Sequence, residues 1–247
     1  MLAGVSVEYY ARLERGNLGG VSESVLDAIA RALRLDEAER AHLFDLARAA
    51  NTTTRPRRKP QRQVSPSVQR ILDAMTTVPA FVQNGRLDIV AVNRLGRALY
   101  SPMFDDPARA PNFARFIFFS PHATDLYVDW DEAANTVVAL LRTEAGRDPY
   151  DKGLSGLIGE LSTRSEEFRT RWATHIVRLH QTGRKQFHHP VVGALDLTFD
   201  VMDLAASPDL KLIAYSAEPG SASADALNLL ASWTASLDQT HTEPNIS

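Results

Sequence analysis

Apolar residues in the first part of the chain recur three or four positions apart, which is the spacing of one-sided helices. Three segments follow this pattern: 7–13, 25–35 and 37–50. Ser22 and Asp36 precede the second and third segments and are favourable N-cap residues, so both helices have a defined start. The pattern predicts an all-α unit over residues 1–50.

The next stretch has neither helical nor strand spacing. Residues 51–63 contain two prolines and no apolar side chain, so this stretch cannot bury a face. Five of its residues are basic and none is acidic: Arg55, Arg57, Arg58, Lys59 and Arg62. We therefore expect a basic linker over residues 51–66.

Beyond the linker, helical and strand spacings both occur. The pattern predicts a helix over 67–75, a hairpin over 80–92 with its turn at Asn84-Gly85, and helices from 94 to about 173. Strand spacing then returns in three runs: 176–181 with 184–188, 194–204 and 210–217, separated by Thr182-Gly183 and by Ser207-Pro208-Asp209.

Strands at both ends of a helical segment predict an α+β domain with a mostly antiparallel sheet. We place this domain at residues 67–236, with its large helical insert between the hairpin and the later strands, and a C-terminal tail at 237–247. Because the sheet must close across the insert, we expect a ligand pocket between the sheet and the helices.

Composition narrows the class of protein. The chain has 247 residues, of which 44% are hydrophobic and 23% charged, values typical of a soluble folded protein. Cysteine is absent, which excludes disulfides, thiolate metal sites and cysteine nucleophiles. The longest apolar run, 137–141, is far shorter than the roughly 20 residues of a membrane span, and the N-terminus lacks a signal pattern. We expect a cytoplasmic protein with no membrane partner.

Charge is distributed unevenly along the chain. Residues 1–63 hold 11 basic and 8 acidic side chains, whereas residues 64–247 hold 16 basic and 22 acidic ones. A basic head on an acidic body is expected of a nucleic-acid binder with a separate second module. A solvated linker explains the basic residues equally well, so charge alone leaves both interpretations open.

The segment 3–16 combines a glycine turn at Gly4, a cap at Ser6, a short helix and a glycine stop at Gly16. In a helix-turn-helix, such a turn lets the second helix enter the major groove of double-stranded DNA. We expect Arg15 to contact a phosphate and four side chains to face the bases: Ser6, Glu8, Tyr9 and Arg12. A capped helix in an ordinary bundle is the alternative.

This segment resembles the recognition helix of the xenobiotic-response-element-type bacterial regulators. The matching residues are Val5, Ser6, Tyr9, Leu13, Glu14 and Gly16. A complete domain of this type has a first helix and most of a second before the turn, but only three residues precede Gly4 here. We therefore expect a partial helix-turn-helix, which implies a misassigned start or a truncated relative with weak DNA affinity.

Residues 68–235 resemble the ligand-binding domain of the MmyB-like transcription regulators, which has a PAS-like fold. Several separated strings carry the resemblance in the same order: 72–75, 112–119 with Pro121, 126–127, 129–130, 160–162, Arg164-Ser165 with Phe168, Trp172 with His175, and 217–221. The resemblance implies a DNA-binding head and a sensor of small molecules, and fatty-acid-like ligands are associated with the family.

Most large apolar residues of this domain should form its core, but some must line a ligand cavity. Our candidates are Asn93, Arg115, Phe116, Trp130, Trp172 and His175. Arg115 lies among phenylalanines, where a guanidinium needs an anion. A ligand carboxylate or an internal Asp would serve, and the internal salt bridge is the favoured interpretation.

Metal and catalytic interpretations are weaker. The histidines at 175, 180, 188 and 189 lack ligand spacing, and His188 and His189 should point to opposite sides of a strand. The chain also lacks a nucleophile elbow and a phosphate loop. We expect no metal, no cofactor apart from a fatty-acid-like ligand, and no enzyme.

The sequence predicts a ligand-responsive DNA-binding transcriptional regulator that senses a small apolar effector and acts as a homodimer. A sensor or carrier with a vestigial DNA-binding head is the main alternative, and an unidentified enzyme is a distant third. In either of the first two cases the ligand would bind in the PAS-like domain.

Overall fold

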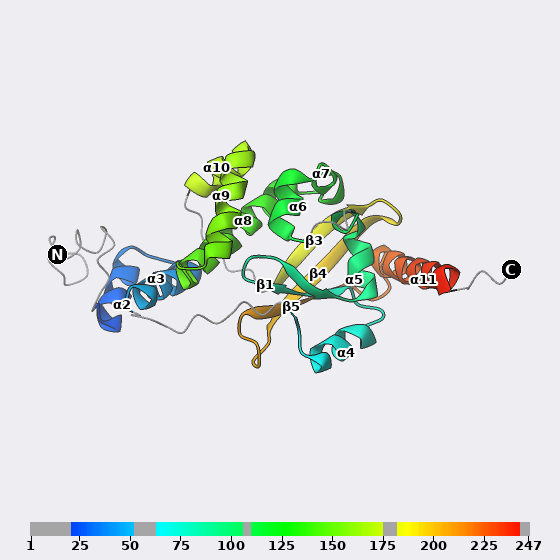
Figure 1. Ribbon diagram of the computed structural model, residues 1–247, viewed down its shortest axis with the longest axis horizontal. Helices are drawn as coiled ribbons and strands as arrows, with labels where there is room; N and C mark the ends of the chain where they lie inside the picture. Colours follow the sequence, from blue (N-terminus) through cyan, green and yellow to red (C-terminus); the bar gives the residue numbers. More distant parts are fainter. Residues whose placement is uncertain (1–20, 52–62, 106–109, 175–181, 243–247) are drawn as a thin grey trace.

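The computed structural model describes residues 21–51, 63–105, 110–174 and 182–242 (Figure 1). The predicted helix over 7–13 and most of the predicted linker lie outside these ranges. In the described part of the chain, helices and an antiparallel sheet occur together, so the predicted α+β class is confirmed. No helix within these ranges combines the length and the hydropathy needed to cross a bilayer.

The two predicted helices of the N-terminal unit are confirmed as α2 (Glu23–Ala32) and α3 (Glu37–Asn51). Asp36 Oδ1 accepts from the Glu39 amide at 2.8 Å, and Glu39 Oε2 accepts from the Asp36 amide at 2.9 Å, which forms a capping box. Ser22 occupies the N-cap position of α2 but makes no side-chain cap bond, because its hydroxyl bonds to the hydroxyl of Ser24.

Within the described ranges, five strands form one antiparallel sheet in the order β2-β1-β5-β4-β3. Their bounds are β1 Ala80–Asn84, β2 Ile89–Val92, β3 Thr182–His189, β4 Gly193–Asp203 and β5 Leu210–Ser216. The predicted hairpin is therefore confirmed as β1 and β2. The first and last parts of the domain meet in the centre of the sheet, where β1 pairs with β5.

The predicted strand break at Thr182-Gly183 is wrong, because both residues belong to β3 and pair with Asp200 and Phe199 of β4. The glycine at position 183 is explained by its packing against β4. A Cβ on Gly183 would lie 2.9 Å from the ring of Phe199, so the ring occupies the space a side chain would need.

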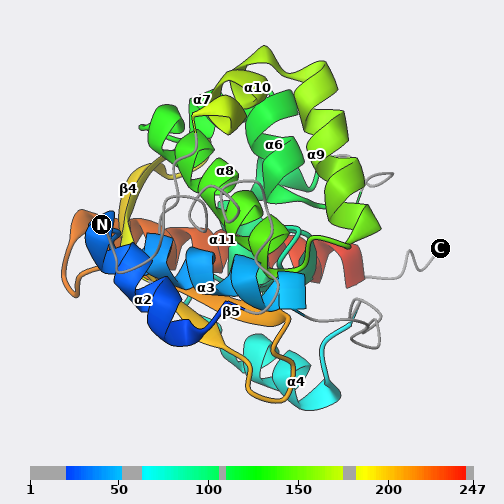
Figure 2. The same cartoon turned by 90° about the vertical axis from the view of Figure 1, so that its left-hand side faces the viewer.

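Helices cover both faces of the sheet (Figures 1 and 2). On one face α4 (Pro66–Ala74) packs through Leu72 on β1 and β5. The other face carries the insert between β2 and β3: α5 Arg94–Leu99, the 3-10 turn η1 Ser101–Met103, α6 Phe113–Phe119, α7 His122–Leu126, α8 Trp130–Arg147, α9 Lys152–Arg164 and α10 Glu166–Ala173. The main core lies between this insert and the sheet.

The C-terminal helix α11 (Ala222–Thr242) does not appear in the sequence-based prediction, which began a tail at residue 237. It packs against α5, with Leu230 beside Leu95 and Ala98, and against β4. Ser223 at its start accepts a hydrogen bond from the backbone amide of Asp196 at 2.9 Å. The helix is therefore part of the folded domain.

Candidate ligand-binding site

A cluster of buried aromatic rings fills the space between the sheet and the insert. The rings come from all three long strands, from β1 and from the insert: Phe81, Tyr100, Phe113, Tyr127, Phe187, Phe199 and Tyr215. Tyr100 lies at the centre, with its ring 5.0 Å from that of Phe113 and 5.8 Å from that of Phe187. The middle of the domain is thus aromatic, as a site for an apolar ligand requires.

Three phenol groups meet inside this cluster and form the tyrosine triad: Tyr100, Tyr127 and Tyr215. The hydroxyl oxygens of Tyr100 and Tyr215 lie 2.6 Å apart, and the hydroxyl of Tyr127 donates to that of Tyr100 at 3.5 Å. Burial raises the pKa of all three phenols, so each keeps its proton. Two contacts use two of the three protons, so within the described residues the triad retains one hydrogen without an acceptor.

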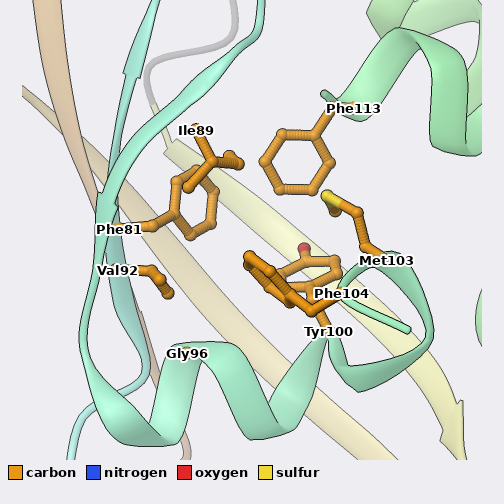
Figure 3. A pocket seen from close by; sticks show the side chains of 8 residues that line it. All are labelled: Phe81, Ile89, Val92, Gly96, Tyr100, Met103, Phe104 and Phe113. Carbon is orange, nitrogen blue, oxygen red and sulfur yellow. The ribbon is translucent and has the colours of Figure 1, made fainter. Parts of the chain in front are cut away.

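A narrow apolar crevice borders the triad at Tyr100 (Figure 3). Its walls are Phe81, Ile89, Val92, Gly96, Tyr100, Met103, Phe104 and Phe113. The empty space is about 150 Å³, including some that is open to solvent, and it is too narrow for a sphere the size of water. A ligand larger than a few atoms must therefore displace side chains to enter.

The outer wall of the crevice is its most adaptable side. Met103 and Phe104 are only partly buried; Met103 is the last residue of the short turn η1, and Phe104 directly follows it. Arg97 covers Phe104 from outside, with its guanidinium carbon 4.3 Å from the ring centre. Methionine has three rotatable bonds and adapts readily to a new neighbour. Opening is therefore expected at this wall.

Asn93, a predicted ligand contact, holds backbone groups together at the opposite wall. Its Oδ1 accepts from the amides of Gly96 at 2.7 Å and Ala80 at 3.0 Å, and its Nδ2 donates to the carbonyls of Met75 and Val78. The side chain is 3% exposed, and these four bonds use its hydrogen-bonding capacity. Asn93 therefore fixes the start of α5 against β1 and does not offer a free group to a ligand.

Close packing at Gly96 depends on this arrangement. A Cβ at Gly96 would lie 2.6 Å from the carbonyl oxygen of Ala80, so no other residue fits without moving the backbone. The tight approach of α5 to β1 places Tyr100, at the end of α5, over the centre of the sheet.

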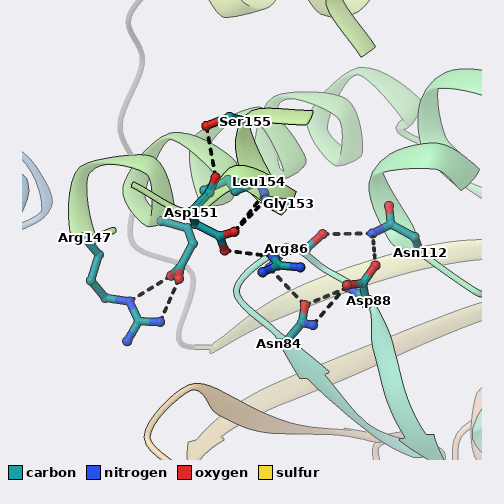
Figure 4. A network of polar contacts seen from close by, with 10 residues as sticks. Asn84, Arg86, Asp88, Asn112, Arg147, Asp151, Gly153, Leu154 and Ser155 are labelled. Carbon is teal, nitrogen blue, oxygen red and sulfur yellow. Dashed lines mark hydrogen bonds and ion pairs between the residues drawn. The ribbon is translucent and has the colours of Figure 1, made fainter. Parts of the chain in front are cut away.

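A polar network fixes the tip of the β1–β2 hairpin (Figure 4). Arg86 Nε donates to Asp151 Oδ2 at 2.7 Å, and Asp151 Oδ1 caps α9 by accepting from the amides of Gly153 and Leu154. Asn112 Nδ2 donates to the carbonyl of Arg86 and to Asp88 Oδ1, both at 2.8 Å. The hairpin, α6 and α9 are thereby held together, which fixes two walls of the crevice.

Burial alone would raise the pKa of the Asp151 carboxyl. Hydrogen bonds from Arg86 and from two backbone amides, together with the charge of Arg86, outweigh this effect and lower the pKa below its usual value of 3.8. Asp151 is therefore ionised at neutral pH, and its bonds in the network are charge-assisted.

Arg115 has an internal partner. Its Nε and Nη2 donate to Glu160 Oε2 at 3.0 and 2.9 Å, and Glu160 Oε1 also accepts from Arg164 at 3.0 Å. The predicted internal salt bridge is therefore present, but its acid is a Glu of α9 and not an Asp. The pair joins α6 to α9 and leaves the guanidinium engaged.

The predicted aromatic contacts pack within the insert. Phe116 is buried in the main core, and Trp130 Nε1 donates to the carbonyl of Ile117 at 3.1 Å. Trp172 stacks on Phe168 with ring centres 5.4 Å apart. The walls of the crevice include none of these predicted residues. His175 lies outside the described residues. The same holds for the predicted DNA contacts, which are Ser6, Glu8, Tyr9, Arg12 and Arg15.

His189 is a structural histidine. It is 1% exposed, its Nε2–H donates to the carbonyl of Ala98 at 3.0 Å, and its Nδ1 accepts from the amide of Val191 at 3.2 Å. Burial lowers its pKa despite the bond to Ala98, so the ring is neutral. His188 is exposed on the other side of β3, as predicted. No group of three potential metal ligands occurs in the described ranges.

Sequence reasoning missed Lys185. Alternation along β3 places it on the same side as Phe187, facing the insert, with its Nζ 5.0 Å from the ring centre of Phe199 and 5.8 Å from that of Tyr127. Desolvation lowers its pKa to about 8, against the opposing effect of Glu132. The two-residue spacing between Lys185 and Phe187 places both on the same face of a strand and could have identified Lys185. The polar neighbours Arg184 and Gln186 obscured this pattern.

Two family descriptions match the chain. The MmyB-like transcription regulator ligand binding domain matches residues 64–230, and a helix-turn-helix domain matches residues 1–43. A search of the curated proteins gives no match. The first match covers more than half of the chain and contains the sheet, the insert, the crevice and the tyrosine triad. The chain therefore belongs to the MmyB-like transcription regulators, as a ligand-responsive DNA-binding regulator with a helix-turn-helix domain before its ligand-binding domain.

Proposed function

We propose that the PAS-like domain binds a small apolar, fatty-acid-like effector between the sheet and the insert, and that the regulator acts in the cytoplasm without catalysing a reaction. The observation that supports this most directly is the apolar crevice, which ends at a buried triad with spare hydrogen-bonding capacity. Apolar walls with a few polar groups are typical of small-molecule sites.

Binding requires the crevice to open, since its present width does not admit a water-sized sphere. We propose that Met103 and Phe104 move outward and that the effector takes their place against Phe81 and Phe113. The hairpin and the start of α5 are fixed by the Arg86 and Asn93 contacts, so they serve as the rigid side of the site.

Filling the crevice should prevent effector binding. Met103→Trp adds bulk at the adaptable wall, and we expect it to weaken binding of dodecanoate, used as a probe, by at least about tenfold, equal to about 1.4 kcal/mol. Isothermal titration calorimetry measures the change. Ile71→Trp is the matched control, because Ile71 is exposed on α4 at the other face of the sheet. Equal affinity in both variants and the wild type would place the effector elsewhere.

We further propose that the regulator is a homodimer and that effector binding changes the relative placement of its two DNA-binding heads. Two observations support a route for this effect. The crevice wall α5 packs on α11, and α11 exposes Leu229 and Trp233 four residues apart on one face. A shift of the C-terminal end of α5, which leads into Met103 and contacts α11 through Ala98, would therefore reach an exposed apolar surface.

A further inference from the structure

Two of the polar side chains expected to orient the effector are not free in this fold, and the third, His175, lies outside the described residues. Asn93 is bonded to four backbone groups, and Arg115 is paired with Glu160. Among the described residues, an effector with a charged head therefore needs another partner on the inner face of the domain.

Lys185 has the features of such a partner. It lies on the sheet face that carries Phe187, whose ring is 5.4 Å from that of Tyr127 in the triad. Its Nζ is over the rings of Tyr127 and Phe199, and within the described ranges no carboxylate lies at ion-pair distance from it. The other lysine described on a strand, Lys211, is exposed and paired with Asp203.

We propose that Lys185 is the residue that binds the acidic head group of the fatty-acid-like effector. This inference rests on the proposed effector site between the sheet and the insert. The head group would lie near Tyr127, which contributes both to the aromatic surroundings of Lys185 and to the tyrosine triad.

The physical reason is the unmatched charge. Aromatic faces stabilise an ammonium group without neutralising it, so a desolvated lysine held this way retains its capacity for a charge-assisted hydrogen bond. A carboxylate entering these surroundings gains more than it would in water, because the local dielectric constant is low. Glu132, the acid that acts on Lys185 through space, is exposed at the start of α8 and is not hydrogen-bonded to it.

The test compares two probes with the same chain, dodecanoate and dodecanol, by isothermal titration calorimetry at neutral pH. For Lys185→Met we expect binding of dodecanoate to weaken by about tenfold or more, the scale of one lost charged hydrogen bond, while dodecanol binds as in the wild type. Lys185→Arg keeps the charge and should retain dodecanoate binding within a few fold. Arg184→Met is the matched control, because Arg184 is exposed on the other face of β3 and paired with Asp196.

The outcomes separate this inference from the proposed function. The inference is supported if Lys185→Met loses dodecanoate binding and the control Arg184→Met does not. Unchanged dodecanoate binding in Lys185→Met, or an equal loss for both probes in a folded variant, overturns it and leaves the apolar site in place. If neither probe binds the wild type, both the proposed effector class and this inference fail. Circular dichroism of each variant establishes that it is folded.

Discussion

At the scale of single residues, the polar groups that face the interior of this domain include two kinds. Asn93 and His189 have partners for every strong donor and acceptor, so their role is to hold the backbone. The tyrosine triad and Lys185 retain capacity that the described residues do not use. A polar group in the interior whose hydrogen-bonding capacity is unused lowers the stability of the fold. Such groups are retained mainly where function needs them.

Lys185→Met should therefore stabilise the protein at pH 7, by about 1 to 3 kcal/mol, because it removes the cost of desolvating an ammonium group. The pKa of Lys185 is about 8 in the folded state against 10.5 otherwise, so the unfolded chain binds more protons between these values. Stability of the wild type should rise with pH across that window relative to the variant. Urea unfolding at pH 7 and at about pH 9.5 measures both effects.

The control is Lys152→Met, because Lys152 is exposed at the start of α9. It should leave the free energy of unfolding nearly unchanged. A variant of Lys185 that is less stable than the wild type at pH 7 would show that the ammonium is well solvated or paired.

At the scale of elements, the site depends on a hairpin that is held at its tip. Gly85 lies so close to α8 that a Cβ would be 2.2 Å from the carboxyl carbon of Glu144. Arg86 and Asp151 connect the same tip to α9 through an ion pair with 24% and 13% of the two side chains exposed. The rigidity of two crevice walls therefore rests on contacts between residues that do not themselves line the crevice.

Asp151→Asn should destabilise the protein by about 1 to 3 kcal/mol at pH 7, because Arg86 loses its anion and the cap of α9 loses its charge. The lowered pKa of Asp151 contributes stability above 3.8, and this contribution is lost as the pH falls through the folded-state value. The difference in the free energy of unfolding between the wild type and Asp151→Asn should therefore become smaller at acidic pH. Urea unfolding at pH 7 and below pH 3.8 measures it.

Asp225→Asn serves as the comparison, since Asp225 is an exposed acid in the first turn of α11. Its effect on unfolding should be small at both pH values. A difference for Asp151→Asn that stays constant with pH would mean that the ion pair does not contribute.

At the scale of the whole molecule, the N-terminal unit and the ligand-binding domain are in contact. Helix α3 packs on α8, and the C-terminal part of α8 carries Glu144 beside the hairpin tip. The N-terminal unit lies at the end of the molecule opposite the C-terminal end of α11 (Figure 1). A change at the crevice thus has two routes outward, through α8 toward α3 and through α5 toward α11.

DNA binding should be strongly salt-dependent. We expect Arg15→Ala to weaken binding to all sequences and to reduce the slope of log affinity against log salt by about 1, as for one lost phosphate contact. Arg12→Ala should instead relax sequence preference, at a cost of about 1 to 3 kcal/mol on the preferred site. Gel shifts at several salt concentrations measure both effects.

Arg70→Ala is the control for these variants, because Arg70 is an exposed arginine of α4 outside the DNA-binding unit. It should change neither slope nor preference. A wild-type slope near zero would favour the alternative function, a sensor or carrier whose DNA-binding head is vestigial.

Local patterns in the sequence determined much of this protein. Helices α2 and α3, the hairpin of β1 and β2 and the three later strands follow from apolar spacing, the capping residue Asp36 and the turn at Asn84-Gly85. These features depend on interactions between residues a few positions apart. They can therefore be predicted without knowing which distant parts of the chain come into contact.

Only the tertiary structure decided which polar groups are satisfied. Arg115 pairs with Glu160 across 45 positions of the chain, and Asn93 reaches backbone groups 13 to 18 positions away. Lys185 resembles a surface lysine in sequence and becomes desolvated only when α7 and β4 bring Tyr127 and Phe199 around it. Burial and pairing depend on contacts between distant residues, so apolar spacing predicts the elements of this fold but not the groups that its site leaves free.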